Sequence, residues 1–284
     1  MLFSEALKAF AQYQSSIERS PRTIRGYDQD LSMFQRYLES QWNTSVYLSD
    51  LRTEDVEAFL LYLKERGTKT STRKRYLGSI RSFCKWAHSR DLLAEDIASK
   101  LEPIKVHIPE RRYLTEQEVE EFIDAIEHRV VKVAVQIMYH TGLRVSECVG
   151  LKTHHVDLKD QLVRVVGGKG NKHRVVPIRR RLLDILTDYE TWRVESEYYL
   201  ATRKTGRLSA VRVAAVIRET VAKLGWEKGS VTAHSFRHAF ASHLIHRNVN
   251  LVNVSKLLGH ASLNTTSIYT HAHLDDLREA VNSL

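Results

Sequence analysis

The chain has 284 residues, 43% of them hydrophobic, which is enough to bury a core in one or two domains. Its formal net charge of +9 indicates a polyanionic partner, either nucleic acid or an acidic membrane surface. No apolar run approaches the roughly 18 residues of a spanning helix, and the first ten residues lack the pattern of a secretory leader. Cys84 and Cys148 form neither a CxxC pair nor a disulfide framework. We therefore expect a cytoplasmic protein that binds nucleic acid rather than a membrane.

The N-terminal part is predicted to be all-helical. Ser20 is placed as the N-cap and Pro21 as the first residue of a helix whose apolar residues recur at helical spacing. Two further helices are predicted within TEDVEAFLLYLKERG, residues 53–67, and TSTRKRYLGSIRSFCKWAHSRD, residues 70–91.

The last of these segments is strongly basic. Residues 64–90 hold nine Lys or Arg and one acid, Glu65. Such a run is often only the solvated face of a helix. Here the apolar positions are spaced to pack a core on one side, which leaves the basic side to meet phosphates. The candidate DNA-contacting residues are Arg73, Lys74, Arg75 and Arg81.

A linker is expected in EPIKVHIPERRY, residues 102–113, which contains two of the four prolines. A capping box follows at once, with Thr115 as N-cap and Glu118 three residues later. We therefore expect one domain over residues 1–101 and a second over residues 114–284.

The second domain is predicted to be mostly helical with a small antiparallel sheet. A buried helix over residues 130–141 ends at Gly142, a residue type that tolerates a left-handed C-cap. QLVRVV and KHRVVPI flank GGKGN and read as two strands of a hairpin with Lys169 near its tip. Further helices are expected over residues 209–223, 234–247, 250–258 and 274–283. The fold class is therefore mainly α, with an all-α first domain and an α+β second domain.

Several common kinds of site are disfavoured. GGKGNK does not satisfy the phosphate-binding loop, which needs G-x-x-x-x-G-K followed by Ser or Thr, and neither GxGxxG after a strand nor HExxH occurs. His234, His238 and His243 crowd one segment, but their spacing does not place three ligands on one helical face. We expect no metal and no cofactor.

Six polar residues remain in places where structure alone does not require them. Each has an ordinary structural interpretation, such as a cation at a helix C-terminus, a turn lysine or a packed tyrosine. Together they supply what phosphoryl transfer without a metal needs: arginines for the phosphate, proton-transfer groups and a nucleophile. They are Arg144, Lys169, His234, Arg237, His260 and Tyr269.

Four motifs carry a resemblance to a known family. In chain order they are TGLRVSE at 141–147, GGKGNKHRVVPI at 167–178, HSFRHAFASHL at 234–244 and LLGHASLNTTSIYTH at 257–271. With these motifs the chain resembles the tyrosine recombinases, the lambda-integrase and Xer class of site-specific DNA recombinases. The basic helical N-terminal part looks like the core-binding domain of that family, and the second domain like its catalytic domain.

The resemblance implies a role for each candidate residue. Arg144 and Arg237 would bind the scissile phosphate, and Lys169 would protonate the leaving 5′ oxygen. The nucleophile would be Tyr269, which would form a 3′-phosphotyrosyl link. His234 and His260 would assist proton transfer.

The resemblance also implies partners: double-stranded DNA with an inverted-repeat core site, a homotetramer on two such sites, and accessory DNA-bound protomers. Compact size and Xer-like motifs favour resolution of DNA dimers or transposon cointegrates, as in transposon-encoded resolvases of the TnpI type. Alternatives are an integrase of a phage or other element, a type IB topoisomerase-like activity, and a non-catalytic DNA-binding regulator. An apolar stripe at Leu274, Leu277, Val281 and Leu284 could pack on its own domain or dock on a neighbouring protomer.

Overall fold

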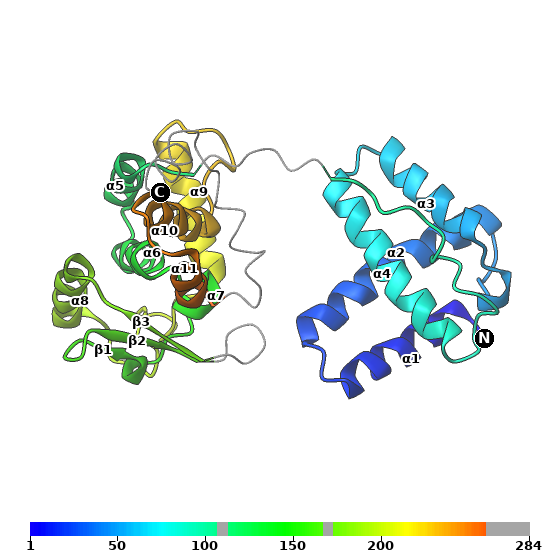
Figure 1. The fold of residues 1–284 in the computed structure, drawn as a ribbon, viewed down its shortest axis with the longest axis horizontal. Helices are drawn as coiled ribbons and strands as arrows, with labels where there is room; N and C mark the ends of the chain where they lie inside the picture. The colour runs from blue at the N-terminus through cyan, green and yellow to red at the C-terminus, as the bar shows by residue number, and fades with distance from the viewer. Residues whose placement is uncertain (107–112, 167–172, 260–284) are drawn as a thin grey trace, which may run out of the picture. The chain divides into compact units, whose positions relative to one another are not determined.

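A computed structural model describes residues 1–106, 113–166 and 173–259. The chain divides into two compact units, Met1–Glu110 and Arg111–Leu284, and each surrounds a core of its own (Figure 1). Within the described ranges, every helix is too short or too polar to cross a membrane. Four predicted features lie partly or wholly outside these ranges: the middle of the linker over residues 102–113, the Lys169 turn, the His260 and Tyr269 segment, and the helix over residues 274–283.

The first unit is all-helical, as predicted. Ser20 Oγ accepts a hydrogen bond from the backbone N–H of Thr23 at 3.2 Å, and Pro21 is the first residue of its helix, which confirms the predicted N-terminus. A further helix begins at Phe3; the side chain of its N-cap Leu2 makes no capping hydrogen bond, and the Glu5 carboxylate accepts the Leu2 N–H at 3.0 Å. The elements are α1 (Phe3–Ser16), α2 (Pro21–Trp42), the 3-10 helix η1 (Leu48–Asp50), α3 (Thr53–Glu65) and α4 (Thr70–His88).

Aromatic side chains fill the core of this unit. Phe3 of α1 packs on Phe83 of α4 with ring centroids 5.1 Å apart, and Phe34 of α2 packs on Phe59 of α3 at the same distance. The apolar face predicted for the basic segment is confirmed, because four of its members are buried: Leu77, Ile80, Phe83 and Trp86.

One buried carboxylate joins α2 to α4. Asp30 of α2 is 1% exposed and accepts hydrogen bonds from the guanidinium of Arg75 and, at 2.7 Å, from the hydroxyl of Ser79. Arg75 and Ser79 lie one turn apart on α4, so a single carboxylate fixes the rotation of α4 against α2. Part of the basic helix therefore serves packing within the unit.

The second unit is mostly helical and contains a three-stranded antiparallel sheet in the order β1-β2-β3. The predicted hairpin strands are confirmed, with Val163 paired to Val176 and Val165 to Arg174. The structure adds β1 at one edge and the helix α8. The elements are α5 (Glu116–Ala125), α6 (Arg129–Thr141), α7 (Val145–Cys148), η2 (Thr153–His155), β1 (Val156–Asp157), β2 (Leu162–Val165), β3 (Arg174–Pro177), α8 (Arg180–Trp192), α9 (Ala210–Lys223), α10 (Ala233–His246) and α11 (Leu251–Leu258).

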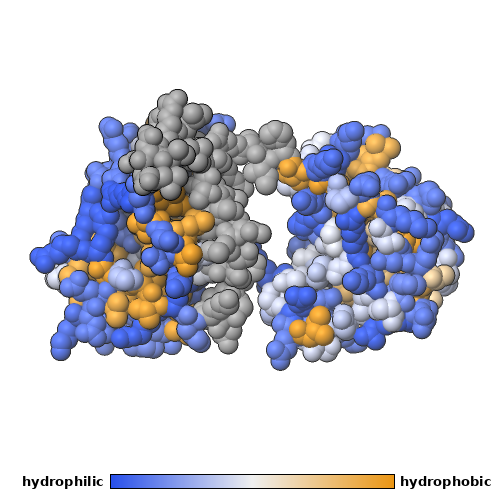
Figure 2. All heavy atoms as spheres, in the orientation of Figure 1, coloured by the Kyte–Doolittle hydropathy of each residue, from blue (hydrophilic) through white to orange (hydrophobic). Residues whose placement is uncertain are grey.

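The central helix of this unit is α6, which packs against α5, α8, α9 and α10. Its C-terminus is as predicted, because Gly142 adopts the left-handed conformation at φ 67°. The predicted capping box of α5 is also present, with Thr115 Oγ1 accepting from the Glu118 N–H at 3.2 Å. Figure 2 shows apolar residues gathered over α10 and α11; the partly buried ones there include Phe240, Leu244 and Ile245.

Candidate active site

The turn after α6 is the first component of the site. A Cβ on Gly142 would lie 2.6 Å from the Phe240 ring and 2.8 Å from Leu258, so this turn needs glycine for both its conformation and its close packing. Two residues later Arg144 is the N-cap of the short helix α7. The turn thus places Arg144 where α6, α10 and α11 come together.

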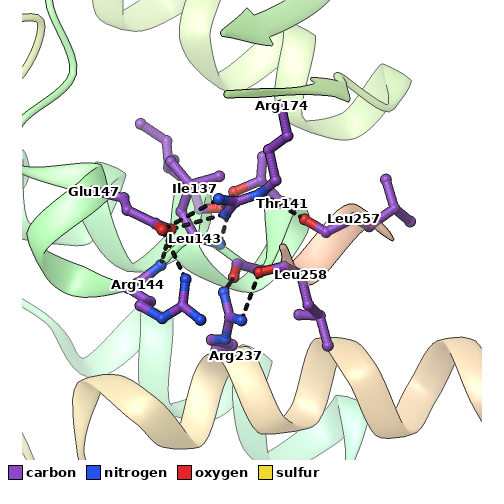
Figure 3. A network of polar contacts seen from close by, with 10 residues as sticks. Ile137, Thr141, Leu143, Arg144, Glu147, Arg174, Arg237, Leu257 and Leu258 are labelled. Atoms are coloured by element: carbon purple, nitrogen blue, oxygen red, sulfur yellow. Dashed lines mark hydrogen bonds and ion pairs between the residues drawn. The ribbon is translucent and has the colours of Figure 1, made fainter. Parts of the chain in front are cut away.

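Glu147 of α7 holds Arg144 from two sides. Its Oε2 accepts the Arg144 backbone N–H at 2.9 Å, and its Oε1 accepts from the Arg144 guanidinium at 2.8 Å (Figure 3). The carboxylate is 6% exposed. Burial alone would raise its pKa, but hydrogen bonds from Arg174 and Arg144 outweigh burial and lower the pKa to about 2. Glu147 is therefore ionised throughout the physiological pH range.

Arg174, the first residue of β3, meets Glu147 from the opposite side. Its two terminal nitrogens donate to the two carboxylate oxygens at 3.1 and 2.8 Å, a bidentate pair, and its Nε donates to the carbonyl of Leu257 at 2.8 Å. The Arg174 side chain is 10% exposed. One side chain thus connects β3, α7 and the last turn of α11.

Arg237 of α10 lies in the same network and is 3% exposed. Its guanidinium donates to the carbonyl of Gly142 and, at 2.7 Å, to the carbonyl of Leu258. The last two carbonyls of α11 therefore each accept from an arginine, Leu257 from Arg174 and Leu258 from Arg237. This fixes the point at which the chain continues to residues 260–284.

Positive charge exceeds negative charge among the described side chains of this network. Figure 3 shows Arg144 and Arg174 bound to the carboxylate of Glu147, and Arg237 bound to backbone carbonyls beside them. These four side chains carry a net charge of +2. Guanidinium groups held in a fixed geometry suit a phosphate oxyanion. Arg144 is 24% exposed and remains accessible to such a ligand.

The structure brings together two of the six candidate residues, Arg144 and Arg237. His234 lies at the start of α10 and is exposed, with its ring centroid 6.1 Å from that of His238. The other three candidates, Lys169, His260 and Tyr269, lie outside the described residues. Two described segments next to them in the chain reach the network. β2 and β3 flank residues 167–172, and α11 ends one residue before Gly259.

Two residues of the network were not among the candidates, Glu147 and Arg174. Glu147 carries a local signal, since it lies three residues after the N-cap Arg144, where a carboxylate caps a helix. Arg174 carries none, because its partners lie 27 residues before it and 83 residues after it in the chain.

A separate group of titratable side chains lines a pocket of about 260 Å³ between α6, β3, α10 and α11. Burial, helped by the charges of Arg179 and Arg181, lowers the pKa of His140 to about 3. Burial also lowers the pKa of His243, whose ring nitrogens contact the Tyr139 hydroxyl and the Leu114 carbonyl. Because their pKa values are lowered, both histidines are neutral at pH 7. The described part of the chain holds no cluster of three metal-binding side chains.

The candidate DNA contacts on α4 are not equivalent. Arg75 is tied to the buried Asp30. Arg81 donates to the backbone carbonyls of Ala98 and Leu101, which lie in the segment that follows α4. Both arginines thus have structural roles within the unit.

The other two candidates are placed differently. Arg73 is half-buried and donates to the Thr70 hydroxyl at 3.3 Å. Lys74 is exposed.

Comparison with protein families accounts for both units. The model of the phage integrase family matches residues 112–275, and that of the phage integrase N-terminal SAM-like domain matches residues 7–91. Tyrosine recombinase XerA of Thermococcus kodakarensis is 34% identical over 98% of this chain and 94% of its own length. Tyrosine recombinase XerD of Shewanella oneidensis is 32% identical over 93% of this chain and 91% of its own length.

Solved structures share the fold. Residues 82–397 of the Tn1549 transposon integrase, in complex with circular intermediate DNA, superpose with a TM-score of 0.82 over 99% of both chains at 17% identity. A lambda integrase fragment, residues 75–356 as a dimer bound to a COC′ core site, gives 0.81 over 97% of this chain and 98% of that chain at 19% identity. These matches confirm the predicted fold class. The chain belongs to the tyrosine recombinase, or phage integrase, family of site-specific DNA recombinases.

Proposed function

We propose that the chain cleaves and rejoins DNA through a 3′-phosphotyrosyl intermediate formed by Tyr269. The observation that carries this proposal is the guanidinium network, in which Arg144 and Arg237 lie together with an excess of positive charge. Arginines in this arrangement bind the nonbridging oxygens of the scissile phosphate and stabilise the charge of the pentacoordinate transition state. Lys169 protonates the leaving 5′ oxygen, and His234 and His260 assist proton transfer.

The chemistry conserves bond energy. Attack of the Tyr269 oxygen on phosphorus forms the tyrosyl ester while the bond to the 5′ oxygen breaks, and that oxygen leaves as a hydroxyl. A 5′ hydroxyl of a second duplex then attacks the ester and releases the tyrosine. No metal or nucleotide cofactor takes part in these steps. The reaction runs in the cytoplasm, in a homotetramer on two inverted-repeat core sites, with accessory DNA-bound protomers where the site requires them.

We assign the biological role to resolution of DNA dimers or transposon cointegrates. The features behind this proposal are the compact size of the chain and its Xer-like motifs, and relatives named XerA and XerD match over most of their length. A type IB topoisomerase-like activity would use a similar set of residues but rejoin the same strand.

The nucleophile is tested with a covalent-adduct assay. Duplexes that the protein binds are selected from a randomised library, and one is rebuilt with a nick beside the cleavage position so that the cleaved product cannot religate. The wild type is expected to form an adduct with labelled DNA that survives denaturation. Tyr269→Phe is expected to form none while its DNA affinity stays within about twofold, because a ring without the hydroxyl keeps the contacts but has no nucleophile.

Tyr198→Phe is the matched control, since it removes a tyrosine hydroxyl elsewhere in the same unit, and it should form the adduct as the wild type does. An adduct on the Tyr269→Phe protein would refute the assignment of the nucleophile. A plasmid with two directly repeated sites then separates the roles: a recombinase yields two circles, whereas a topoisomerase only relaxes the plasmid.

A further inference from the structure

Arg174 occupies a position that the proposed chemistry does not explain. It neither belongs to the six candidate residues nor lies on the surface, yet it makes more polar contacts in the network than Arg144 does. Burying an arginine requires partners that replace its water shell. Its partners are the carboxylate of Glu147 and the carbonyl of Leu257, on two elements that flank the site.

The first consequence concerns the charge available at Arg144. Glu147 shares its two oxygens between Arg144 and Arg174. Because Arg174 already forms a bidentate pair with the carboxylate, Glu147 offsets less of the positive potential that Arg144 offers to a phosphate. Without Arg174, the buried carboxylate of Glu147 would have Arg144 as its remaining cation among the described residues, and the two would pair more tightly. A phosphate would then compete with Glu147 for the same guanidinium.

The second consequence concerns the segment that follows α11. Arg174 Nε binds the carbonyl of Leu257 at 2.8 Å. A Cβ on Gly259 would lie 3.0 Å from Arg174 Nη1 and 3.1 Å from its Cδ, so the glycine backbone lies directly against this side chain. The chain therefore leaves α11 in contact with Arg174 on its way to His260.

We propose that Arg174 is a positioning residue for DNA cleavage. It acts as the main counter-ion of Glu147, so that Arg144, whose guanidinium gives Glu147 a single hydrogen bond, can bind the scissile phosphate. It also fixes the end of α11 relative to β3. The inference rests on the proposed function, because it takes Arg144 as a phosphate-binding residue. If Arg174 is the counter-ion of Glu147, removing the carboxylate charge should offset the loss of Arg174, whereas it would not do so for a merely structural arginine.

The test uses the full-length protein and the nicked duplex described above. Arg174→Met is expected to slow adduct formation about 30- to 100-fold while the DNA dissociation constant changes less than about threefold, since the lost interaction matters when charge develops on the phosphate. Arg174→Lys keeps the positive charge but not the bidentate geometry, and we expect it to form the adduct about tenfold more slowly than the wild type. Arg164→Met is the matched control: Arg164 lies on β2 of the same sheet and pairs with Asp157 at 3.2 Å, and its loss should leave the rate within about twofold, as for an exposed ion pair.

The double variant Arg174→Met/Glu147→Gln decides the mechanism. If Glu147 sequesters Arg144 once Arg174 is gone, removing the carboxylate charge should restore the cleavage rate at least about fivefold over Arg174→Met. A double variant slower than Arg174→Met would overturn the inference and leave Arg174 with a structural role only. An unaffected Arg174→Met protein would overturn it as well.

A stability measurement keeps this test separate from the test of the nucleophile. In urea unfolding, Glu147→Gln should lower the free energy of unfolding by less in the Arg174→Met background than in the wild type, because the two side chains are in contact. Additive effects would contradict the counter-ion relation even if no cleavage were seen. A wild type without any adduct would contradict the proposed function, whereas a normal wild type with a normal Arg174→Met variant contradicts only the inference.

Discussion

At the scale of single residues, Glu147 determines the electrostatics of the site. A carboxylate that is 6% exposed loses most of its hydration, and only direct hydrogen bonds compensate for that loss. Glu147 receives them from two guanidinium groups and one backbone N–H. The hydrogen bonds more than offset the effect of burial, which is why the pKa falls to about 2 although burial alone would raise it.

This shift predicts how stability depends on pH. The pKa of Glu147 is about 2 in the folded protein and about 4.3 in an unfolded chain, so its ionised form contributes roughly 2–3 kcal/mol to folding at neutral pH. Because the folded pKa is depressed, the contribution is present above pH 4.3 and is lost as the pH falls toward 2. We expect urea unfolding to show Glu147→Gln less stable than the wild type at pH 6, with the difference shrinking toward pH 2.5. A difference that stays constant over this range would contradict the prediction.

At the scale of elements, α4 combines two tasks on one helix. Its apolar side packs the core of the first unit, and its basic side carries most of the charge of residues 64–90. Arg75 and Arg81 nevertheless point their guanidinium groups at acceptors within the unit. A DNA-binding test that replaces Arg75 would therefore disturb the packing of α4 on α2 as well as any phosphate contact.

The Asp30 cluster predicts an asymmetric effect on stability. Arg75→Met would leave the carboxylate of Asp30, which is 2% exposed, with Ser79 but with no cation among the described residues. We expect this to lower the free energy of unfolding by about 2–4 kcal/mol. Asp30→Asn keeps a partner for Ser79 and leaves an arginine whose side chain is 52% exposed, so we expect about 1 kcal/mol. The measurement is urea unfolding of both variants and of the double variant. The double variant should be more stable than Arg75→Met; equal costs for the two single variants would contradict this account.

The sequence could predict those elements whose signals are local, and could not predict those that depend on residues far away in the chain. Helices with a capping side chain, such as those after Ser20 and Thr115, and the glycine at position 142 were placed correctly because their signals lie within a few residues. Helices α1 and α8 begin at Phe3 and Arg180, after N-cap residues, Leu2 and Arg179, whose own side chains make no capping hydrogen bond. Their burial is decided by partners far away in the chain.

The site divides in the same way. The motifs indicated Arg144 and Arg237, and the structure joins them through Gly142. Arg174 could not be selected from the sequence, because the fold alone brings its two partners to it, the carboxylate of Glu147 and the carbonyl of Leu257.

At the scale of the whole molecule, the two units differ in charge. Residues 1–110 contain 17 Lys and Arg and 15 Asp and Glu, whereas residues 111–284 contain 26 and 19. The first unit is therefore nearly neutral overall, and its positive charge is concentrated in residues 64–90. Its contribution to DNA binding, as we propose it, depends on the placement of charge on α4 rather than on net charge. Each unit has a separate core, so each should fold as a fragment.

This separation allows the contribution of each unit to DNA affinity to be measured. We expect the fragments 1–110 and 111–284 to bind the selected duplex weakly, and the full chain to bind about 10²- to 10⁴-fold more tightly than either, because linkage makes the second contact intramolecular. The slope of log affinity against log salt for the full chain should approach the sum of the fragment slopes. Lys74→Ala and Lys85→Ala, which remove two exposed charges of α4, should lower the slope by the same amount in fragment 1–110 and in the full chain. A fragment 111–284 that binds as tightly as the full chain would show that the first unit takes no part in binding.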